Sequence, residues 1–151
     1  MSPTSTATVS AVEVLNKQVA NFSVLYMKLH SFHWFVKGPQ FFTLHAKFEE
    51  LYTQAAATLD ELAERVLAIK GKPPATLKEQ LELASVKEAK GNESPDQMVK
   101  ALIADYQTII SEIDKGADAA DKEGDASTAD LLTGLQTTLE KQVWMLQACM
   151  G

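Results

Sequence analysis

Apolar residues recur at steps of three or four along most of this chain, which is the spacing of amphipathic helices. The first stripe consists of Val12, Leu15, Val19, Phe22, Tyr26, Leu29 and Val36, and His33 fills its one gap. Ser10, followed three residues later by Glu13, has the pattern of a capping box, and Gly38-Pro39 is a stop signal. The pattern therefore predicts a long helix between Ser10 and Gly38.

Three more stripes follow, and each is bounded by helix signals. They predict helices over residues 43–70, over residues 95–122 and from about residue 127 onward. Ser94, Pro95 and Gln97 supply an N-cap, a first-turn proline and a capping-box partner for the helix that starts at residue 95. Residues 71–93 are too many for a simple turn and contain prolines and glycines, so we expect a short helix there, at residues 77–83.

The connections between these helices predict the fold class. The first and third connections are short, so the helices they join should pack as antiparallel hairpins, whereas the second is a long crossover. We therefore expect an all-α, ferritin-like four-helix bundle over residues 10–151, with a short extra helix in the crossover between the second and third long helices. Residues 1–9 contain no Lys or Arg and no apolar run, which predicts a flexible leader.

Length and composition limit the classes of protein to which this chain can belong. The 151 residues suit one domain with one core. Asp and Glu number 20 against 14 Lys and Arg, and the formal net charge of -6 disfavours a surface that neutralises nucleic-acid phosphates. No run approaches about 18 consecutive apolar residues, so no transmembrane span is predicted. Cys149 is the only cysteine, which excludes an intrachain disulfide and favours a reducing cytoplasm.

The second predicted helix carries ligand-type residues on one face. At about 100° per residue, His45, Glu49, Asp60 and Glu64 fall within an arc of about 100°. His45 and Glu64 would nevertheless lie about 28 Å apart along the axis, whereas a transition metal holds its ligands at about 2.0 to 2.3 Å. One copy of this helix therefore cannot form one metal site.

The same residues are arranged symmetrically along the helix. The pair His45 and Glu64 and the pair Glu49 and Asp60 share a midpoint between positions 54 and 55. Two copies packed antiparallel about a two-fold axis at that midpoint would bring each residue opposite its pair in the partner subunit. The alanines at positions 55–57 would allow the two helices to approach closely. The spacing thus predicts sites shared between subunits.

His33 fits the same construction, because His33 and His45 are equidistant from a hairpin centre at Pro39. Each site would combine ligands from both subunits: His33, His45 and Glu49 from one, and Asp60 and Glu64 from the other. Imidazole and carboxylate ligands without thiolate suit Fe, Mn or Zn, with open positions for one or two ions. The residues alone leave open a hydrogen-bonded core histidine at position 33 and a solvated helix face for the other four.

Several segments then resemble one known family. They are HSFHW at residues 30–34, KGPQFFTLHAKFEELY at 37–52, ATLKE at 75–79, LDELAER at 59–65, AADKEGD at 119–125 and VWM at 143–145. In type, order and spacing they resemble the Dps family, the DNA-binding proteins from starved cells or miniferritins. The resemblance covers nearly the whole chain. It implies a hollow dodecamer built from two-fold dimers, which oxidises ferrous iron preferentially with hydrogen peroxide, also with dioxygen, and stores ferric mineral.

The resemblance also implies the site residues. The ligands of a two-iron ferroxidase centre fall on His33, His45, Asp60 and Glu64, with Glu49 where many members have Asp, and zinc is an expected competitor. No Glu-x-x-His motif of larger ferritins occurs. Trp34 is an expected electron donor beside the site, although the residue pattern equally fits a packed aromatic.

Three aspartates match positions near the family's acidic ion-entry pore, namely Asp121, Asp125 and Asp130. An aspartate ring would attract cations, although the same segment fits a solvated helix end. Within this resemblance the sequence predicts a bacterial, cytoplasmic iron-storing ferroxidase that protects against oxidative damage. The alternatives are a nucleoid protein that mainly compacts DNA and a metal-free helical bundle. Because the leader lacks Lys and Arg, we expect weak or no direct DNA binding.

Overall fold

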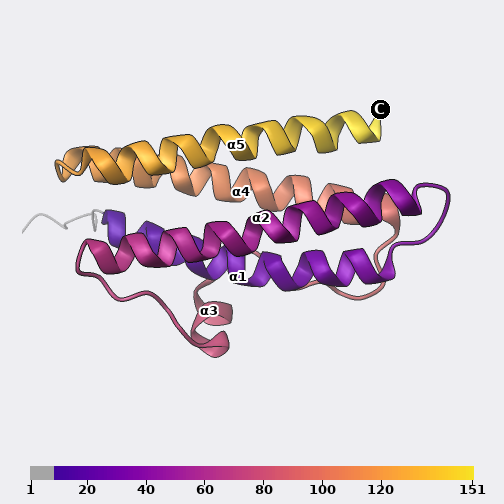
Figure 1. The fold of residues 1–151 in the computed structure, drawn as a ribbon, viewed down its shortest axis with the longest axis horizontal. Helices are drawn as coiled ribbons and strands as arrows, with labels where there is room; N and C mark the ends of the chain where they lie inside the picture. Colours follow the sequence, from indigo (N-terminus) through magenta and orange to yellow (C-terminus); the bar gives the residue numbers. More distant parts are fainter. Residues whose placement is uncertain (1–8) are drawn as a thin grey trace, which may run out of the picture.

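The computed structural model describes residues 9–151, and this part of the chain contains helices and no strands. The helices are α1 (Ala11–Phe35), α2 (Phe41–Ala68), α3 (Leu77–Leu83), α4 (Pro95–Lys122) and α5 (Ala126–Met150). Residues 1–8, which make up nearly all of the expected leader, lie outside the described residues, and Val9 is exposed. Figure 1 shows the long helices α1, α2, α4 and α5 running side by side, with short α3 on one flank.

The long helices form two antiparallel hairpins. Helix α1 packs chiefly against α2, and α4 chiefly against α5, while α1 also contacts α4 and α3. In Figure 1 the α4–α5 hairpin lies above the α1–α2 hairpin, and the crossover that carries α3 connects them. The predicted fold class, a ferritin-like four-helix bundle with a short extra helix in its crossover, is confirmed. No helix within residues 9–151 combines the length and apolar character needed to span a bilayer.

The apolar stripes predicted from the sequence meet in one core between the hairpins. Its largest side chains with under 2% exposure include Phe22, Phe32, Phe48, Leu25 and Leu102. Helix α1 contributes most, because it has neighbours on three sides and therefore buries residues around most of its circumference. Near the helix ends that carry His33 and His45, Phe32 of α1 and Phe48 of α2 are fully buried and contact each other in this core.

Both predicted N-caps form, but the capping box predicted at α1 is only half formed, whereas the one at α4 is complete. At α1, the Glu13 N–H donates to Ser10 Oγ at 3.1 Å. At α4, the Gln97 N–H donates to Ser94 Oγ at 3.2 Å, and the Ser94 N–H donates to Gln97 Oε1 at 2.9 Å, which completes a capping box. Each bond satisfies an N–H group that has no partner within its own helix.

Helix α2 is displaced by two residues at both ends from the predicted range of 43–70. It begins at Phe41 because Gly38, at φ +105°, closes a turn in which the Phe41 N–H donates to the Gly38 carbonyl at 3.0 Å. It ends with Lys70 in the left-handed region, at φ 72°, and with the Gly71 N–H donating to the Val66 carbonyl at 2.8 Å. The longer N-terminal end places His45 in the second turn of α2.

A buried polar network fixes the crossover against the bundle. The Glu112 carboxylate of α4 accepts hydrogen bonds from Gln18 at 3.0 Å, from Asn21 at 2.8 Å and from the Ser85 hydroxyl at 2.6 Å. Asn21 Oδ1 in turn accepts from the Ser85 and Val86 N–H groups. Because Gln18 and Asn21 are fully buried on α1, these bonds also satisfy side chains that have no access to water.

Candidate metal centre

His33 and His45 lie face to face where α1 ends and α2 begins. Their rings stack with centroids 3.6 Å apart and an interplanar angle of 12°. His33 Nδ1 lies 2.7 Å from the His45 carbonyl oxygen, and His45 Nδ1 lies 2.7 Å from the His33 carbonyl oxygen. The sequence expectation that the two histidines are level on neighbouring helices agrees with this geometry.

These reciprocal hydrogen bonds determine which ring nitrogen is available. A carbonyl oxygen only accepts, so each Nδ1 carries the hydrogen and donates it. In a neutral ring the lone pair then resides on Nε2, and a carbonyl on the far nitrogen is a common orienting partner of metal-binding histidines. The hairpin thus presents two parallel rings, each with Nε2 free to bind a cation.

The carboxylates of the predicted site are exposed on the same helix as His45. Glu49 is one turn after His45, and Asp60 and Glu64 lie in the second half of α2. Within residues 9–151, the chain brings no three His, Cys, Asp or Glu side chains together as a metal site. A single chain therefore supplies the histidine pair, while Asp60 and Glu64 point to solvent elsewhere on α2.

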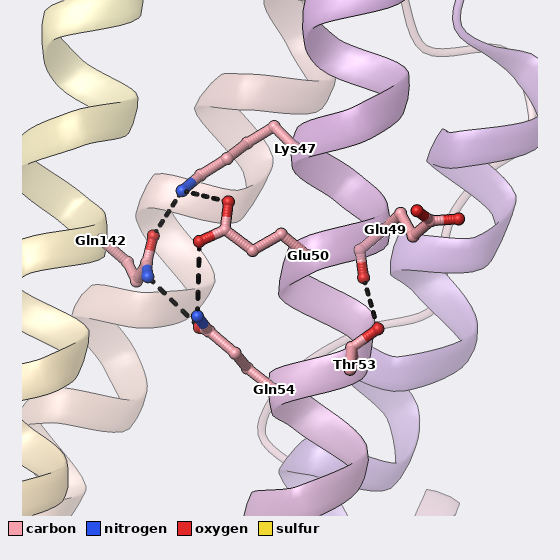
Figure 2. Close-up of polar contacts among 6 residues, drawn as sticks. All are labelled: Lys47, Glu49, Glu50, Thr53, Gln54 and Gln142. Atoms are coloured by element: carbon pink, nitrogen blue, oxygen red, sulfur yellow. Dashed lines mark hydrogen bonds and ion pairs between the residues drawn. The ribbon is translucent and has the colours of Figure 1, made fainter.

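Figure 2 shows polar side chains on two different sides of α2. On one face Lys47 Nζ donates to Gln142 Oε1 of α5 at 2.8 Å and lies 3.3 Å from Glu50 Oε2. Gln142 also donates to Gln54 Oε1 at 3.2 Å. The Glu49 carboxylate points away from this network, on the opposite side of the helix. The hydrogen bonds between α2 and α5 therefore use Lys47 and Gln54, and they leave Glu49 available for another role.

An aromatic cluster surrounds the histidine pair. The Tyr52 ring stacks on His30, with centroids 3.7 Å apart, and stands edge-on to His33 at 5.3 Å. His30 also lies 5.4 Å from Trp34, which is 60% exposed. The sequence analysis did not identify Tyr52 as a residue of this site. Its position three residues after Glu49 was the available signal.

Tyr52 is also the polar neighbour of a predicted ligand. Its hydroxyl donates to Glu49 Oε1 at 3.3 Å. Partial burial, together with the negative charge and hydrogen bond of Glu49, raises the pKa of the Tyr52 hydroxyl. Tyr52 therefore stays protonated at neutral pH and keeps this hydrogen bond.

The centre of α2 bears on the predicted two-fold contact. Ala55 is buried in the core of its own bundle, whereas Ala56 and Ala57 are exposed. Ala56 and Ala57 therefore present small side chains at the surface near the shared midpoint, and Ala55 does not. The two-fold pairing of His45 with Glu64 and of Glu49 with Asp60 stays a prediction.

The three predicted pore aspartates lie around the turn between α4 and α5. Asp121 and Asp130 are exposed. Asp125 is half-buried and caps α5: it accepts from the Thr128 N–H at 3.0 Å and lies 3.1 Å from Arg65 Nη2. Hydrogen bonds from Thr128 and the Arg65 guanidinium hold the pKa of Asp125 below its ordinary value. Asp125 thus has a structural role whether or not it also lies on an ion path.

A four-helix bundle with one long crossover between its two hairpins has the topology of ferritin-like proteins. A ferritin family model, described as a ferritin-like domain, matches residues 12–151. DNA protection during starvation protein 2 of Bacillus anthracis is 58% identical over 137 residues, covering 91% of this chain and 94% of that protein. General stress protein 20U of Bacillus subtilis (strain 168) is 54% identical, over 93% of this chain and 97% of that protein.

A solved structure agrees with these relatives. The crystal structure of a Dps protein from Bacillus brevis matches with a TM-score of 0.92 at 52% identity, over 93% of this chain and 95% of that chain. The chain therefore belongs to the Dps family of ferritin-like proteins.

Proposed function

We propose that this protein is an iron-storing ferroxidase whose sites are shared between two subunits. The observation that carries the proposal is the stacked pair His33 and His45, whose Nδ1 atoms are both engaged by carbonyl groups. Such a pair has two oriented Nε2 donors at a rigid helix junction, which suits borderline cations such as ferrous iron or zinc. A stacked pair kept only for packing would have no need of two uncommitted nitrogens on the same side.

Solved relatives support a metal role for this junction. The Dps protein of Listeria innocua has been solved after soaking with zinc and with cobalt. Two further structures of that protein carry a glycine in place of a histidine, at positions 12 residues apart. His33 and His45 are separated by the same 12 residues. We infer that Asp60 and Glu64 of the partner subunit complete the ligand set, with Glu49 as the fifth ligand.

Exposed apolar side chains support assembly. Met27, Trp34, Phe35, Phe42, Leu77 and Trp144 are each more than half exposed in the single chain. Such a number of large apolar groups at the surface is typical of interaction sites. We propose a dodecamer built from two-fold dimers, in the cytoplasm of a bacterial cell, with Asp121, Asp125 and Asp130 near an entry path for cations.

The chemistry is a two-electron reduction of hydrogen peroxide. Two ferrous ions each lose one electron, the O–O bond breaks, and two protons from solvent convert the oxygens to water. The protein's part is to hold both ions beside one peroxide molecule, so that no one-electron product escapes as hydroxyl radical. Dioxygen is the slower oxidant, and the ferric product is stored inside the shell.

The test adds ferrous iron and then hydrogen peroxide without air, and follows ferric absorbance. The wild-type protein is expected to form ferric ions much faster than buffer. The variant His33→Ala, Glu64→Ala is expected to lose this acceleration. Glu61→Ala, which removes a neighbouring exposed carboxylate on α2, is the matched control and should retain it. Equal rates of ferric ion formation in the wild type and the double variant would refute the proposal.

DNA binding is the second candidate function, because curated relatives carry the name DNA protection during starvation protein. The net charge of -6 opposes direct contact with phosphates. We therefore propose that DNA is protected through iron oxidation, with weak or no direct binding. A gel shift with duplex DNA at near-physiological salt, without added metal, is expected to show no stable complex, and a tight complex would contradict this.

A further inference from the structure

Tyr52 lies where a residue that supplies electrons to the iron site would need to be. Its ring stands edge-on to His33 and its hydroxyl donates to Glu49 Oε1 at 3.3 Å. Trp34, the residue predicted from the sequence for this role, is in ring contact with His30 and is 60% exposed. Tyr52 is thus in contact with two proposed ligands, whereas Trp34 reaches the site only through His30.

The hydrogen bond to Glu49 gives the Tyr52 proton a destination. A phenol that loses an electron becomes strongly acidic, so its oxidation is favourable only if the proton can leave at the same time. Glu49 Oε1 accepts that hydrogen bond, and its second oxygen is free to face a cation. The side chain of Glu49 is longer than that of Asp, which allows its carboxylate to contact Tyr52, three residues further along the helix.

Stacking fixes the Tyr52 ring in this position. His30 lies parallel to it, with centroids 3.7 Å apart and 20° between the planes. His30 itself is held by the contact of its Nδ1 with the Tyr26 carbonyl oxygen at 2.9 Å. The next ring beyond His30 is that of Trp34. The cluster therefore forms a continuous aromatic path from His33 through Tyr52 and His30 to the surface.

We propose that Tyr52 donates the second electron to hydrogen peroxide when only one ferrous ion occupies the site, which rests on the proposed ferroxidase function. The ferrous ion gives one electron and Tyr52 gives the other. The O–O bond then breaks to give two hydroxides. The Tyr52 proton passes to Glu49 and converts one hydroxide to water, while the other stays with the ferric ion. Tyr52 is left as a neutral tyrosyl radical.

This step covers the case in which a site holds one ferrous ion instead of two. With one ferrous ion alone, a single electron would split peroxide into hydroxide and hydroxyl radical. Tyr52 replaces that diffusing radical with one held on the protein. A later ferrous ion returns the electron, and a proton from solvent restores the phenol. The site is then ready for another cycle.

The experiment mixes the assembled protein with less than one ferrous ion per site, adds hydrogen peroxide, and freezes samples for electron paramagnetic resonance. The chain contains three tyrosines, so single variants assign any tyrosyl signal. The wild type is expected to give the signal and Tyr52→Phe to lose it. Tyr26→Phe, which removes a hydroxyl from the same aromatic cluster, is the matched control and should keep it. A spin trap should collect more hydroxyl radical from Tyr52→Phe than from Tyr26→Phe.

A measurement on the wild-type protein can refute the inference by itself, so the test does not depend on whether the variants fold. Absence of a tyrosyl signal in the wild type would refute it, as would a signal that persists in Tyr52→Phe. If the wild type forms ferric ions with excess iron but gives no tyrosyl signal, only the role of Tyr52 fails. If it forms no ferric ions at all, the proposed function fails and this inference fails with it.

Discussion

His33 and His45 orient each other through bonds that neither could make alone. Each ring donates to the backbone of the other residue, and the rings are in van der Waals contact. The orientation of both Nε2 atoms therefore depends on the hairpin between α1 and α2 rather than on flexible side-chain contacts. Since the donors are held before any cation binds, little ordering entropy has to be lost on binding.

Asp125 gives a residue-level prediction of pH dependence. Its folded pKa is lowered by the hydrogen bonds from Thr128 and by Arg65, against the opposing effect of burial. A lowered carboxyl pKa contributes stability that is complete above the unfolded value, about 3.9, and is lost as pH falls through the folded pKa. Asp125→Asn keeps a cap acceptor but loses the charge, so it should cost about 1 kcal/mol at pH 7.

Urea unfolding of the wild type and of Asp125→Asn at pH 7 and near pH 3 checks this prediction. The difference in unfolding free energy should shrink at the lower pH, because the carboxyl of the unfolded wild type binds a proton more readily than that of the folded protein. Asp125→Ala should cost more than Asp125→Asn at both pH values, since it also removes the cap. A difference between the wild type and Asp125→Asn that stays constant would show that the charge contributes nothing.

Residue types alone predicted the histidine pair but not its surroundings. Equal distances from Pro39 were enough to place His33 level with His45. Tyr52 fits the apolar period of α2, so its polar contact with Glu49 depends on where its hydroxyl points, which spacing does not specify. Lys70 likewise adopts the left-handed conformation, which glycine adopts most readily at the end of a helix. The glycine is next in the chain because a Cβ on Gly71 would lie 2.9 Å from Val66 Cγ1.

At the scale of helices, Gly116 determines how closely α4 approaches its neighbours. A Cβ there would lie 2.5 Å from Val14 Cγ1 of α1 and 3.2 Å from Leu132 Cδ1 of α5. Glycine within a helix costs about 1 kcal/mol relative to alanine. Gly116→Ala should nevertheless destabilise the protein, by about 1 to 3 kcal/mol, because the added methyl forces these packed helices apart.

Gly134 in α5 is the matched control for Gly116. A Cβ at Gly134 would have no neighbour within 4 Å, so Gly134→Ala should stabilise the chain by about 0.5 to 1 kcal/mol through backbone entropy alone. Adding Val14→Ala to Gly116→Ala should recover part of the loss. Denaturant unfolding of the four proteins measures these differences. Stabilisation by Gly116→Ala would contradict the packing account.

The helices themselves were predictable because the spacing of apolar residues, the capping residues and the helix-breaking prolines and glycines all indicate the same helices. Ser10, Ser94 and the apolar steps located the starts of α1 and α4, and the short helix in the crossover is α3. The α2 boundaries were two residues off, since a turn at Gly38 and a left-handed Lys70 depend on backbone geometry. Helix α3 was expected from its flanking breakers, yet it buries none of its residues within the chain.

At the scale of the whole molecule, a single chain does not bring the proposed ligands together within residues 9–151. The histidine pair is formed within residues 9–151, but the carboxylates Asp60 and Glu64 are exposed on the far half of α2. A straight helix cannot bring its own ends together, so Asp60 and Glu64 cannot reach the histidines of their own chain, and in the proposed site a second copy supplies them. The shared midpoint at positions 54 and 55 is the sequence feature that anticipates this, since a two-fold axis exchanges positions equidistant from it.

Subunit mixing distinguishes a shared site from one built within a chain. His45→Ala and Asp60→Ala are each expected to abolish rapid ferric formation when they assemble alone. In a mixed dimer, one of the two sites would combine His33 and His45 from the Asp60→Ala subunit with the intact Asp60 of its partner. The other site would carry both defects. Unfolding and refolding the two variants together in equal amounts should therefore restore about a quarter of the wild-type rate, because random pairing makes half of the dimers mixed.

Two controls make this result decisive. Each variant refolded alone corrects for losses during refolding, and a mixture of the two variants without unfolding should stay inactive. His45→Ala refolded with His33→Ala should also stay inactive, since both defects lie in the half-site from the same subunit and no pairing produces an intact set. Recovery in that second mixture would mean that the two histidines of one site come from different subunits. No recovery in the first mixture would mean that the ligands come from a single chain. The carboxylates at positions 60 and 64 would then need another role.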